Sequence, residues 1–290
     1  MELDELEWGD VLAQSEGIVW CQARLGDDQV VAVRWSHGLL ESERAARLLL
    51  ADAVAPTAEL IGSGEGWMVL EDLRESMWRP ITPQEQDDAP VLSMLGRWLA
   101  RAHRIEGSAV SRALPDSALA QLLTPELVEL ALPALPGDLA AILPSALESW
   151  AHRVGQEPVR LGLGHLELST VHVMGTLDAM PTDLSLCCAS TREADLLSIR
   201  DGLEEDAWRR VEQGYLAEIG EDEEPQEGVL AAERGRALTA RVIGTLLAGQ
   251  PASEADLAQL RTALTRGVMG KKRQKGLPEA DPSSRVRKRT

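Results

Sequence analysis

A chain of 290 residues can bury a large core, as one large domain or as two lobes packed together. Hydrophobic residues make up 44% and charged residues 26%, which is typical of soluble proteins, and no apolar stretch approaches the roughly 20 residues that cross a membrane. The net charge of the whole chain is −18. The last twenty residues carry a net charge of +6, so the rest of the chain carries −24. Such an acidic body argues against nucleic acid binding through the main domain.

Composition also limits location and cysteine chemistry. The acidic N-terminus lacks the basic start of a secretory signal, which predicts a cytoplasmic protein. Cys21, Cys187 and Cys188 form neither a CxxC motif nor a disulfide framework, so we expect reduced, structural cysteines. Phe and Asn are absent and no Lys precedes Lys271, which indicates a GC-rich bacterial genome.

The first 73 residues combine strand signals with one helix. We expect strands over 11–14, 18–25, 29–35, 58–61 and 66–70, and a helix over 39–53. Gly26-Asp27-Asp28 predicts a hairpin between the second and third strands, and Gly62-Ser63-Gly64 predicts a turn between the last two. The order predicts a small α+β lobe over residues 1–73.

From residue 74 the pattern is mostly helical. Apolar residues spaced by three and four, among them Leu92, Leu95 and Leu99, predict one buried helix stripe. Further helices are expected over 117–132, 138–154, 204–219, 228–248 and 253–267, with Pro144 among the interrupting residues.

One non-helical segment interrupts these helices. It has strand character over 159–163 and leads into a hairpin that closes near 180–185. The whole pattern predicts a large helical lobe over 74–270. The basic residues over 271–290 come with few apolar ones, which predicts a disordered tail. This tail is solubilising, or it contacts an acidic partner, RNA or the body of the protein.

The non-helical segment contains His165-Leu166-Glu167-Leu168, followed by His172-Val173-Met174. This pattern resembles the H-G-D-L-x-x-x-N signature of the aminoglycoside and choline phosphotransferases. Met68–Leu73 is similar to the hinge strand of that family, and Leu95–Arg104 is similar to its L-G-x-x-L-A-x-L-H helix. Asp183 falls where the family places its metal-binding Asp. The resemblance spans about residues 6–200 and implies a two-lobed, protein-kinase-like fold of the α+β class.

The resemblance also implies roles for individual residues, with ATP and Mg²⁺ as cofactors of an active enzyme. Glu167 matches the catalytic Asp, and His172 and Asp183 match the metal ligands. Arg34 matches the phosphate-binding Lys of the third strand. Its acidic partner is Glu43 or Glu41, although Glu43 is also placed to form an exposed pair with Arg47.

Adenine recognition is implied for the hinge residues. In the family, this strand binds the base through its backbone, which here places Glu71 and Leu73 at the nucleotide.

Several of these positions depart from the family pattern. Glu167 adds a methylene to the catalytic side chain, and displacement of about 1 Å can lower a rate on the order of a hundredfold. His172 offers an imidazole where Mg²⁺ prefers oxygen. Leu166 replaces a turn glycine, and the loop Ser15-Glu16-Gly17 places a carboxylate where phosphate would bind.

Three interpretations follow for this cluster. In the first, its residues are relics of an active site, and the chain is a pseudokinase-like homologue that binds a small molecule, a peptide or a partner protein. In the second, it is an ATP-dependent phosphotransferase that acts on a hydroxyl of a small molecule. In the third, His165, Glu167, His172 and Asp183 hold a metal ion.

Overall fold

The computed structural model describes residues 3–15, 18–26, 29–36, 40–53, 55–220 and 225–274. The chain forms two compact units: Met1–Gln121 with Gly155–Leu230, and Leu122–Val154 with Ala231–Thr290. Among the described helices, none is long and apolar enough to span a membrane.

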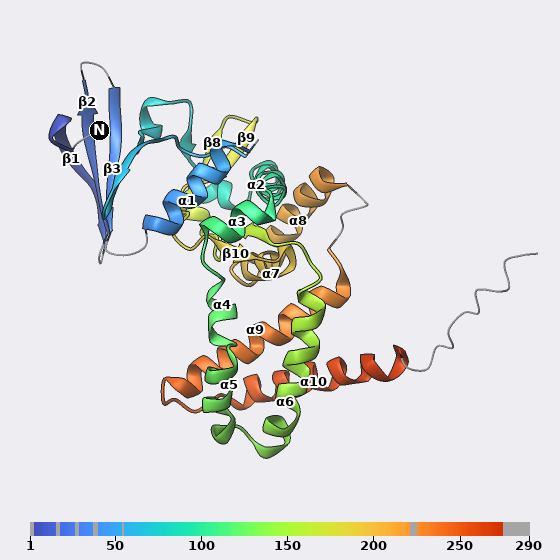
Figure 1. The fold of residues 1–290 in the computed structure, drawn as a ribbon. Coiled ribbons are helices and arrows are strands. Elements are labelled where there is room, and N and C mark those ends of the chain that lie inside the picture. Colours follow the sequence, from blue (N-terminus) through green and yellow to red (C-terminus); the bar gives the residue numbers. More distant parts are fainter. Residues whose placement is uncertain are drawn as a thin grey trace, which may run out of the picture. The chain divides into compact units, whose positions relative to one another are not determined.

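The first unit begins with a five-stranded antiparallel sheet in the order β1-β2-β3-β5-β4 (Figure 1). Its strands are β1 (Leu6–Ser15), β2 (Ile18–Leu25), β3 (Gln29–Ser36), β4 (Leu60–Gly64) and β5 (Trp67–Glu71), preceded by the short helix η1 (Leu3–Glu5). Side chains alternate along β3, so Val31 and Val33 join a small core on one face while Arg34 points to the other. Helix α1 (Leu40–Ala51) follows β3.

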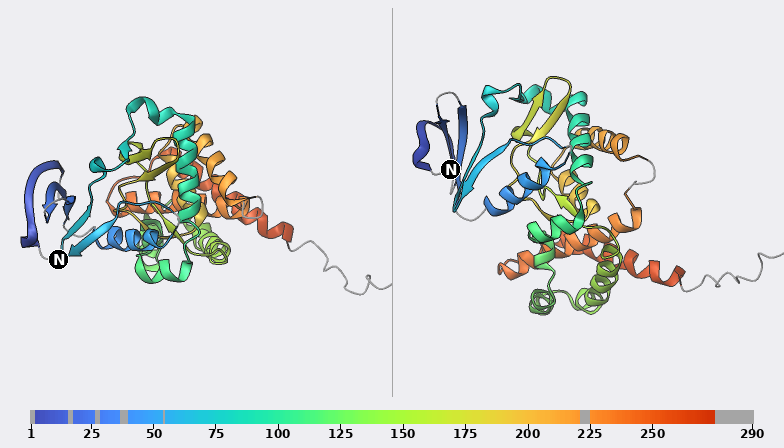
Figure 2. Two further views of the ribbon diagram at one scale, coloured as in Figure 1. Left: turned by 90° about the horizontal axis from the view of Figure 1, so that it is seen from above. Right: turned by 45° about the horizontal axis from the view of Figure 1, so that its top comes forward.

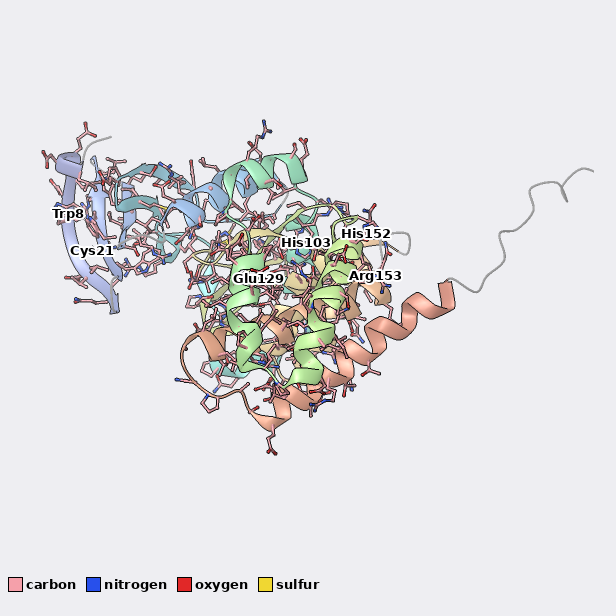
Figure 3. All side chains as sticks on the ribbon, turned by 60° about the horizontal axis from the view of Figure 1, so that its bottom comes forward. Trp8, Cys21, His103, Glu129, His152 and Arg153 are labelled. Carbon is pink, nitrogen blue, oxygen red and sulfur yellow. The ribbon has the colours of Figure 1, made fainter. Side chains whose placement is uncertain are left out.

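Two tryptophans pack against each other, with tilted rings, on the face of the sheet opposite Arg34. Trp8 lies on β1, next to the strand that carries Cys21 (Figure 3). Its ring centroid is 5.0 Å from that of Trp35 on β3. Trp35 packs against the core of Val31 and its neighbours, so the sheet is apolar on this face.

The expected order of five strands and one helix is therefore confirmed, with one correction. Gly62 and Gly64 were expected to form the turn between the last two strands, but both lie within β4. The turn is at Glu65-Gly66, where Gly66 takes a φ of 75° that side-chain-bearing residues rarely adopt.

The remainder of the first unit is mainly helical and contains two small sheets. Its helices are η2 (Leu73–Glu75), η3 (Pro83–Asp87), α2 (Ala89–Ala102), α3 (Gly107–Ala113), η5 (Leu168–Thr170), α7 (Arg192–Asp201) and α8 (Glu205–Ile219). One sheet has the order β6-β8-β9 and the other pairs β10 with β7. The strands are β6 (Arg79–Pro80), β7 (Arg160–Gly162), β8 (Val171–Met174), β9 (Asp178–Pro181) and β10 (Cys188–Ser190).

Helices α2 and α8 cross closely at two glycines. A Cβ on Gly96 would collide with the backbone of Val211, and one on Gly214 would collide with that of Ser93. Each helix therefore has a glycine at the point where the two backbones touch, although glycine is unfavourable inside a helix. On its other side α2 packs against β9, and the β8–β9 hairpin stands beside it (Figure 2).

The second unit is helical. It contains α5 (Pro125–Ala131), η4 (Leu132–Ala134), α6 (Gly137–Val154) and α10 (Glu254–Gln274), and the division between the units falls within α4 (Ala118–Leu122) and α9 (Glu227–Leu247). The single helix expected over 117–132 is two helices, because Pro125 starts a new one at its first position. Pro144, expected to interrupt, lies inside α6.

The predicted boundaries of the lobes and tail stay predictions. Helix α10 continues through Lys271 to Gln274, past the expected start of the tail at residue 271. Residues 275–290 lie outside the described residues.

Candidate functional site

Arg34 and Glu43 form a buried ion pair that joins the sheet to α1. Arg34 on β3 is 2% exposed, and Glu43 on α1 has no exposed surface. The Nη1 of Arg34 donates to Oε2 of Glu43. Of the two acidic residues predicted as partners, Glu43 is therefore the correct one, whereas Glu41 is exposed and pairs with Arg44 at 2.6 Å. The pair fixes a cation on the third strand, at the position predicted to bind phosphate.

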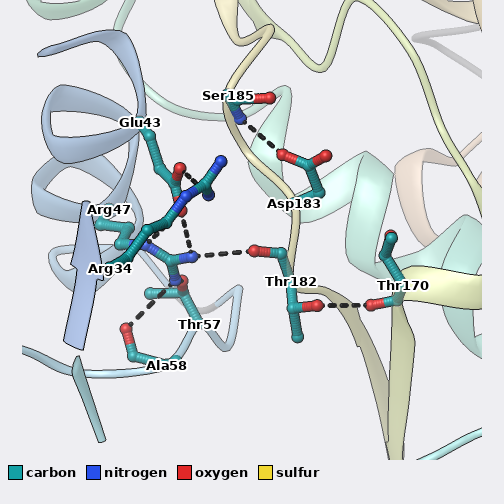
Figure 4. A network of polar contacts seen from close by, with 9 residues as sticks. All are labelled: Arg34, Glu43, Arg47, Thr57, Ala58, Thr170, Thr182, Asp183 and Ser185. Atoms are coloured by element: carbon teal, nitrogen blue, oxygen red, sulfur yellow. Dashed lines mark hydrogen bonds and ion pairs between the residues drawn. The ribbon is translucent and has the colours of Figure 1, made fainter. Parts of the chain in front are cut away.

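A second buried arginine shares the Glu43 carboxylate. The Nη2 of Arg47 donates to Oε1 of Glu43 at 2.6 Å and to the carbonyl oxygen of Thr182 at 2.8 Å. Its Nη1 donates to the hydroxyl of Thr57 at 3.1 Å. The Glu43–Arg47 pair expected from their spacing exists, but it is buried rather than exposed. Arg47 thereby ties α1 to the residue that precedes Asp183 (Figure 4).

Asp183 lies near these arginines, in the segment that follows β9. Its Oδ1 accepts the backbone N–H of Ser185 at 3.0 Å. Partial burial alone would raise the pKa of this carboxyl group, but hydrogen bonds from Ser185 and the charges of Arg34 and Arg47 outweigh it and hold the pKa below its ordinary 3.8. Asp183 is therefore ionised at neutral pH. The structure thus brings together Arg34, Glu43 and Asp183, three of the predicted site residues.

The loop that carries Glu167 is anchored by Asp195, a buried residue of α7. Its Oδ1 accepts the N–H of Gly164 at 3.0 Å, and its Oδ2 accepts from Nε2 of His103 at 3.0 Å. The other ring nitrogen of His103 lies 2.9 Å from the hydroxyl of Tyr215. Burial raises the pKa of Tyr215, so this hydroxyl stays protonated. Asp195, His103 and Tyr215 therefore form a chain of buried polar contacts that ends at the N–H of Gly164 in this loop.

Neither Asp195 nor His103 was among the site residues predicted from the sequence. Two signals were present: His103 ends the apolar helix stripe, and Thr191 stands as an N-cap four residues before Asp195. Leu166 stands where the family pattern has a turn glycine, but a glycine is present two residues earlier, at Gly164. That residue has a φ of 70° and lies so close to the neighbouring carbonyl of residue 186 that a Cβ would come within 2.5 Å of its oxygen.

Glu167 is exposed at the start of η5. Its Oε1 accepts the hydroxyl of Ser169 at 2.7 Å, and its carbonyl oxygen accepts the hydroxyl of Thr170 at 2.8 Å. Within the part of the chain that the structure describes, no hydrogen bond joins Glu167 to Asp183. His165, two residues earlier, is also exposed.

His172 lies on β8, between Pro80 of β6 and Met180 of β9. It is half-buried, and its buried Nδ1 has no hydrogen-bond partner. Burial lowers the pKa of His172 below 6.5, and a hydrogen bond to the backbone of Thr170 offsets only part of this. The imidazole is therefore neutral at neutral pH.

The structure as a whole resembles those of several known enzymes. No known family profile matches the sequence, and no curated protein matches it significantly. An ethanolamine kinase from Plasmodium vivax aligns over 94% of this chain and 85% of its own, with a TM-score of 0.55 and 12% identity. The chain has a kinase-like fold. A choline kinase from Streptococcus pneumoniae (91% and 94%, TM-score 0.53, 12% identity) and a macrolide 2′-phosphotransferase from Brachybacterium faecium (90% and 91%, 0.53, 15%) share it.

The kinase-like fold confirms the α+β class predicted from the sequence. In protein kinases, an ion pair between a cation on the third strand and a Glu on the following helix must form in the active state. Arg34 and Glu43 occupy that arrangement, with Arg in place of Lys. Arg offers a planar fork rather than a point charge, so the geometry toward phosphate differs.

The residues present do not fit the predicted pair of Mg²⁺ ligands. Mg²⁺ prefers oxygen ligands in octahedral geometry. The Asp183 carboxylate meets that requirement, whereas His172 presents a neutral, half-buried imidazole. The predicted four-residue metal site is also wrong for the described residues, because no three His, Cys, Asp or Glu side chains among them gather to hold a metal ion.

The predicted hinge residues lie at the end of β5. The backbone N–H of Glu71 donates to the carbonyl oxygen of Glu59 at 2.9 Å, and Leu73 begins η2. Buried Asp72 caps this helix by accepting the N–H of Arg74 at 3.0 Å. Asp72 therefore fixes the backbone that follows β5, and adenine recognition by Glu71 and Leu73 stays a prediction.

The buried imidazole makes stability depend on pH. Because folding lowers the pKa of His172, the unfolded chain binds a proton more readily than the folded chain. The stabilisation present above pH 6.5 is therefore lost as the pH falls from 6.5 through the lower pKa of the folded state. We expect His172→Asn to flatten the decline in melting temperature between pH 7.5 and pH 5.5. The same change at exposed His165 is the control and should leave the decline as in the wild type. An unchanged decline in His172→Asn would contradict the prediction.

Proposed function

We propose that this chain is a phosphotransferase homologue with little or no phosphate-transfer activity, which binds a small molecule, a peptide or a partner protein around Arg34 and Asp183. The observation that carries the proposal is the geometry of Glu167 and His172. In the family pattern these two positions orient the acceptor hydroxyl and hold the metal. Here the carboxylate of Glu167 accepts from Ser169, and the Nδ1 of His172 is buried without a partner. We also propose a cytoplasmic location. The net charge of −18 supports the further proposal that the main domain binds no nucleic acid.

Glu167 is poorly suited to a catalytic base. Its carboxylate is exposed and accepts a hydrogen bond from Ser169, so its position is set by a neighbouring surface hydroxyl. Its side chain is also one methylene longer than that of Asp. A displacement of about 1 Å can lower a rate on the order of a hundredfold, so the expected residual activity is small.

His172 removes the second oxygen ligand from the metal position. Phosphoryl transfer depends on positioning and on neutralising charge, and metal ions supply much of that neutralisation. Asp183 alone retains a suitable carboxylate. One carboxylate holds Mg²⁺ weakly unless the phosphates of the ligand complete its coordination.

A second candidate, an ATP-dependent phosphotransferase acting on a hydroxyl of a small molecule, is favoured by a different observation. The buried Arg34–Glu43 pair and the ionised Asp183 are the arrangement that active kinases require. One similar structure, a spectinomycin phosphotransferase with TM-score 0.51 and 12% identity, contains ADP and spectinomycin. In this case ATP and Mg²⁺ are the cofactors, and Glu167 is the base.

The two candidates are separated by restoring the residues that the chemistry favours. We expect the double change Glu167→Asp with His172→Asn to raise ATP hydrolysis about a hundredfold over a near-background wild type, because a correctly placed Asp recovers the loss caused by about 1 Å of displacement. Release of phosphate from MgATP is the measurement. Asp183→Asn in the restored protein should return the rate to background.

A different result identifies an enzyme. If the wild type transfers phosphate rapidly, and Glu167→Ala and Asp183→Ala each abolish transfer, the second candidate replaces the first. Equal and undetectable rates in the wild type and in the restored protein, with MgATP shown to bind both, would contradict the assignment of the loss to these two positions. Binding is followed by the rise in melting temperature that a ligand of the folded state produces.

A further inference from the structure

A groove runs between α1 and α3, which lie side by side in the first unit (Figure 1). It consists of two adjoining hollows with volumes of about 350 Å³ and 440 Å³. Leu49 and Asp52 line both hollows, so the two are continuous along α1. The apolar lining comes from α1, from the segment before α3 and from α3 itself: Ala45, Leu48, Leu49, Ile105, Ala109 and Ala113. We call this surface the α1–α3 groove.

The sequence of the two helices explains why the groove is apolar. Leu48 and Leu49 follow Ala45 by three and four residues, so all three share one face of α1. Ala109 and Ala113, four residues apart, share one face of α3. Leu48 is 56% exposed, and apolar side chains from both helices adjoin it along a concave surface. Such a groove suits the apolar face of an amphipathic helix.

Buried contacts on the other side of α1 hold the groove in shape. Ala46 and Leu50 have no exposed surface and lie in the main core. Glu43 and Arg47 form a buried ion pair, and Arg47 also donates to the carbonyl oxygen of Thr182. Because these contacts fix α1, the groove exists before a partner binds, and association requires little ordering of this surface.

Charge around the groove favours a basic partner. The arginines that line it already pair with carboxylates: Arg44 with Glu41, Arg101 with Asp178, and Arg104 with Glu218. Asp52 and Glu106, which also line it, are exposed, and neither forms an ion pair within the residues that the structure describes. Asp52 follows the last turn of α1, where the negative end of the helix dipole adds to its charge. A Lys or Arg of a partner therefore fits beside Asp52, at the point where the two hollows meet.

We propose that the α1–α3 groove binds an amphipathic helix of a basic partner protein. Apolar side chains three and four residues apart on that helix fill the two hollows, and a Lys or Arg between them pairs with Asp52. The acidic body of the chain attracts such a partner over a longer range. The lining residues lie outside the site around Arg34 and Asp183, so binding of this partner does not depend on the proposed function.

The full chain is used to select binders from a displayed library of peptides of about 16 residues, which is enough for about four turns of helix. We expect enrichment of peptides that combine apolar residues three and four apart with Lys or Arg. Fluorescence anisotropy then gives the affinity of a selected peptide. Leu48→Glu and Asp52→Lys should each weaken binding about tenfold or more, because the first places a charge in the apolar groove and the second repels the basic side chain.

Matched controls make the same changes outside the groove. Leu177, which is 73% exposed in the turn after β8, and Glu65, exposed in the turn before β5, line neither hollow. Leu177→Glu and Glu65→Lys should therefore bind the selected peptide as the wild type does. All four changed side chains are exposed, so the variants are expected to fold. Equal affinity in Leu48→Glu and the wild type overturns the proposal, as does a selection that yields no binders or only peptides without basic residues.

Two further measurements locate the peptide and test for another occupant. Amide hydrogen exchange should slow over residues 45–53 and 105–113 when the peptide binds, and slowing only in other segments overturns the proposal. Sedimentation velocity tests whether the groove instead holds a second copy of the chain. We expect the same sedimentation coefficient for the wild type and Leu48→Glu. Dimers of the wild type that Leu48→Glu dissociates would assign the groove to a second copy and overturn the partner helix.

Discussion

Glu43→Ala is expected to destabilise the protein by about 3–5 kcal/mol, because breaking a buried ion pair leaves an uncompensated charge. The effect is large here since one carboxylate serves two cations. Arg34 and Arg47 are 2% and 1% exposed, and both donate to Glu43. Stabilities of whole proteins are about 5–15 kcal/mol, so the variant should unfold at markedly lower urea concentration and temperature.

Glu41→Ala is the matched control for this experiment. It lies two residues away on the same helix, its side chain is 72% exposed, and it pairs with Arg44, whose side chain is 39% exposed. Exposed pairs contribute about 0–1 kcal/mol, so its urea midpoint should stay near that of the wild type. Similar midpoints for the two variants would show that the buried pair does not hold α1 in place.

Local signals allowed the sequence to predict the small sheet and α1. Alternation in β2 and β3 and the hairpin residues between them lie within a few positions, and those strand bounds agree to about one residue. The turn after β4 was misplaced because three candidate glycines stood close together. Only the backbone conformation separates Gly66, with its positive φ, from Gly62 and Gly64.

Buried charge explains most of what the sequence could not predict. Helix α7 was missed, since Glu193 and Asp195 read as surface residues although they are 1% and 2% exposed. Their partners are distant in the chain, and hydrophobic periodicity does not report such contacts.

Asp195→Ala is expected to destabilise the protein by about 2–6 kcal/mol. The change leaves the N–H of Gly164 and the Nε2 of His103 without the carboxylate that accepts from both. A buried donor that loses its partner costs about 1–3 kcal/mol, and two donors are affected. Because Gly164 precedes the loop of Glu167, amide hydrogen exchange over residues 164–170 should accelerate beyond the global loss of stability.

The exchange measurement separates anchoring of the loop from a general effect on α7. Asp201→Ala, at the exposed end of the same helix, should leave both stability and loop exchange near the wild type. Asp195→Asn keeps one oxygen for the N–H of Gly164 but presents an amide to His103, so it should hold the loop while losing part of the stability. Asp195→Ala could instead lower stability while loop exchange rises no more than global unfolding predicts. In that case Asp195 stabilises only the helices, and the position of Glu167 is set by contacts within its own loop.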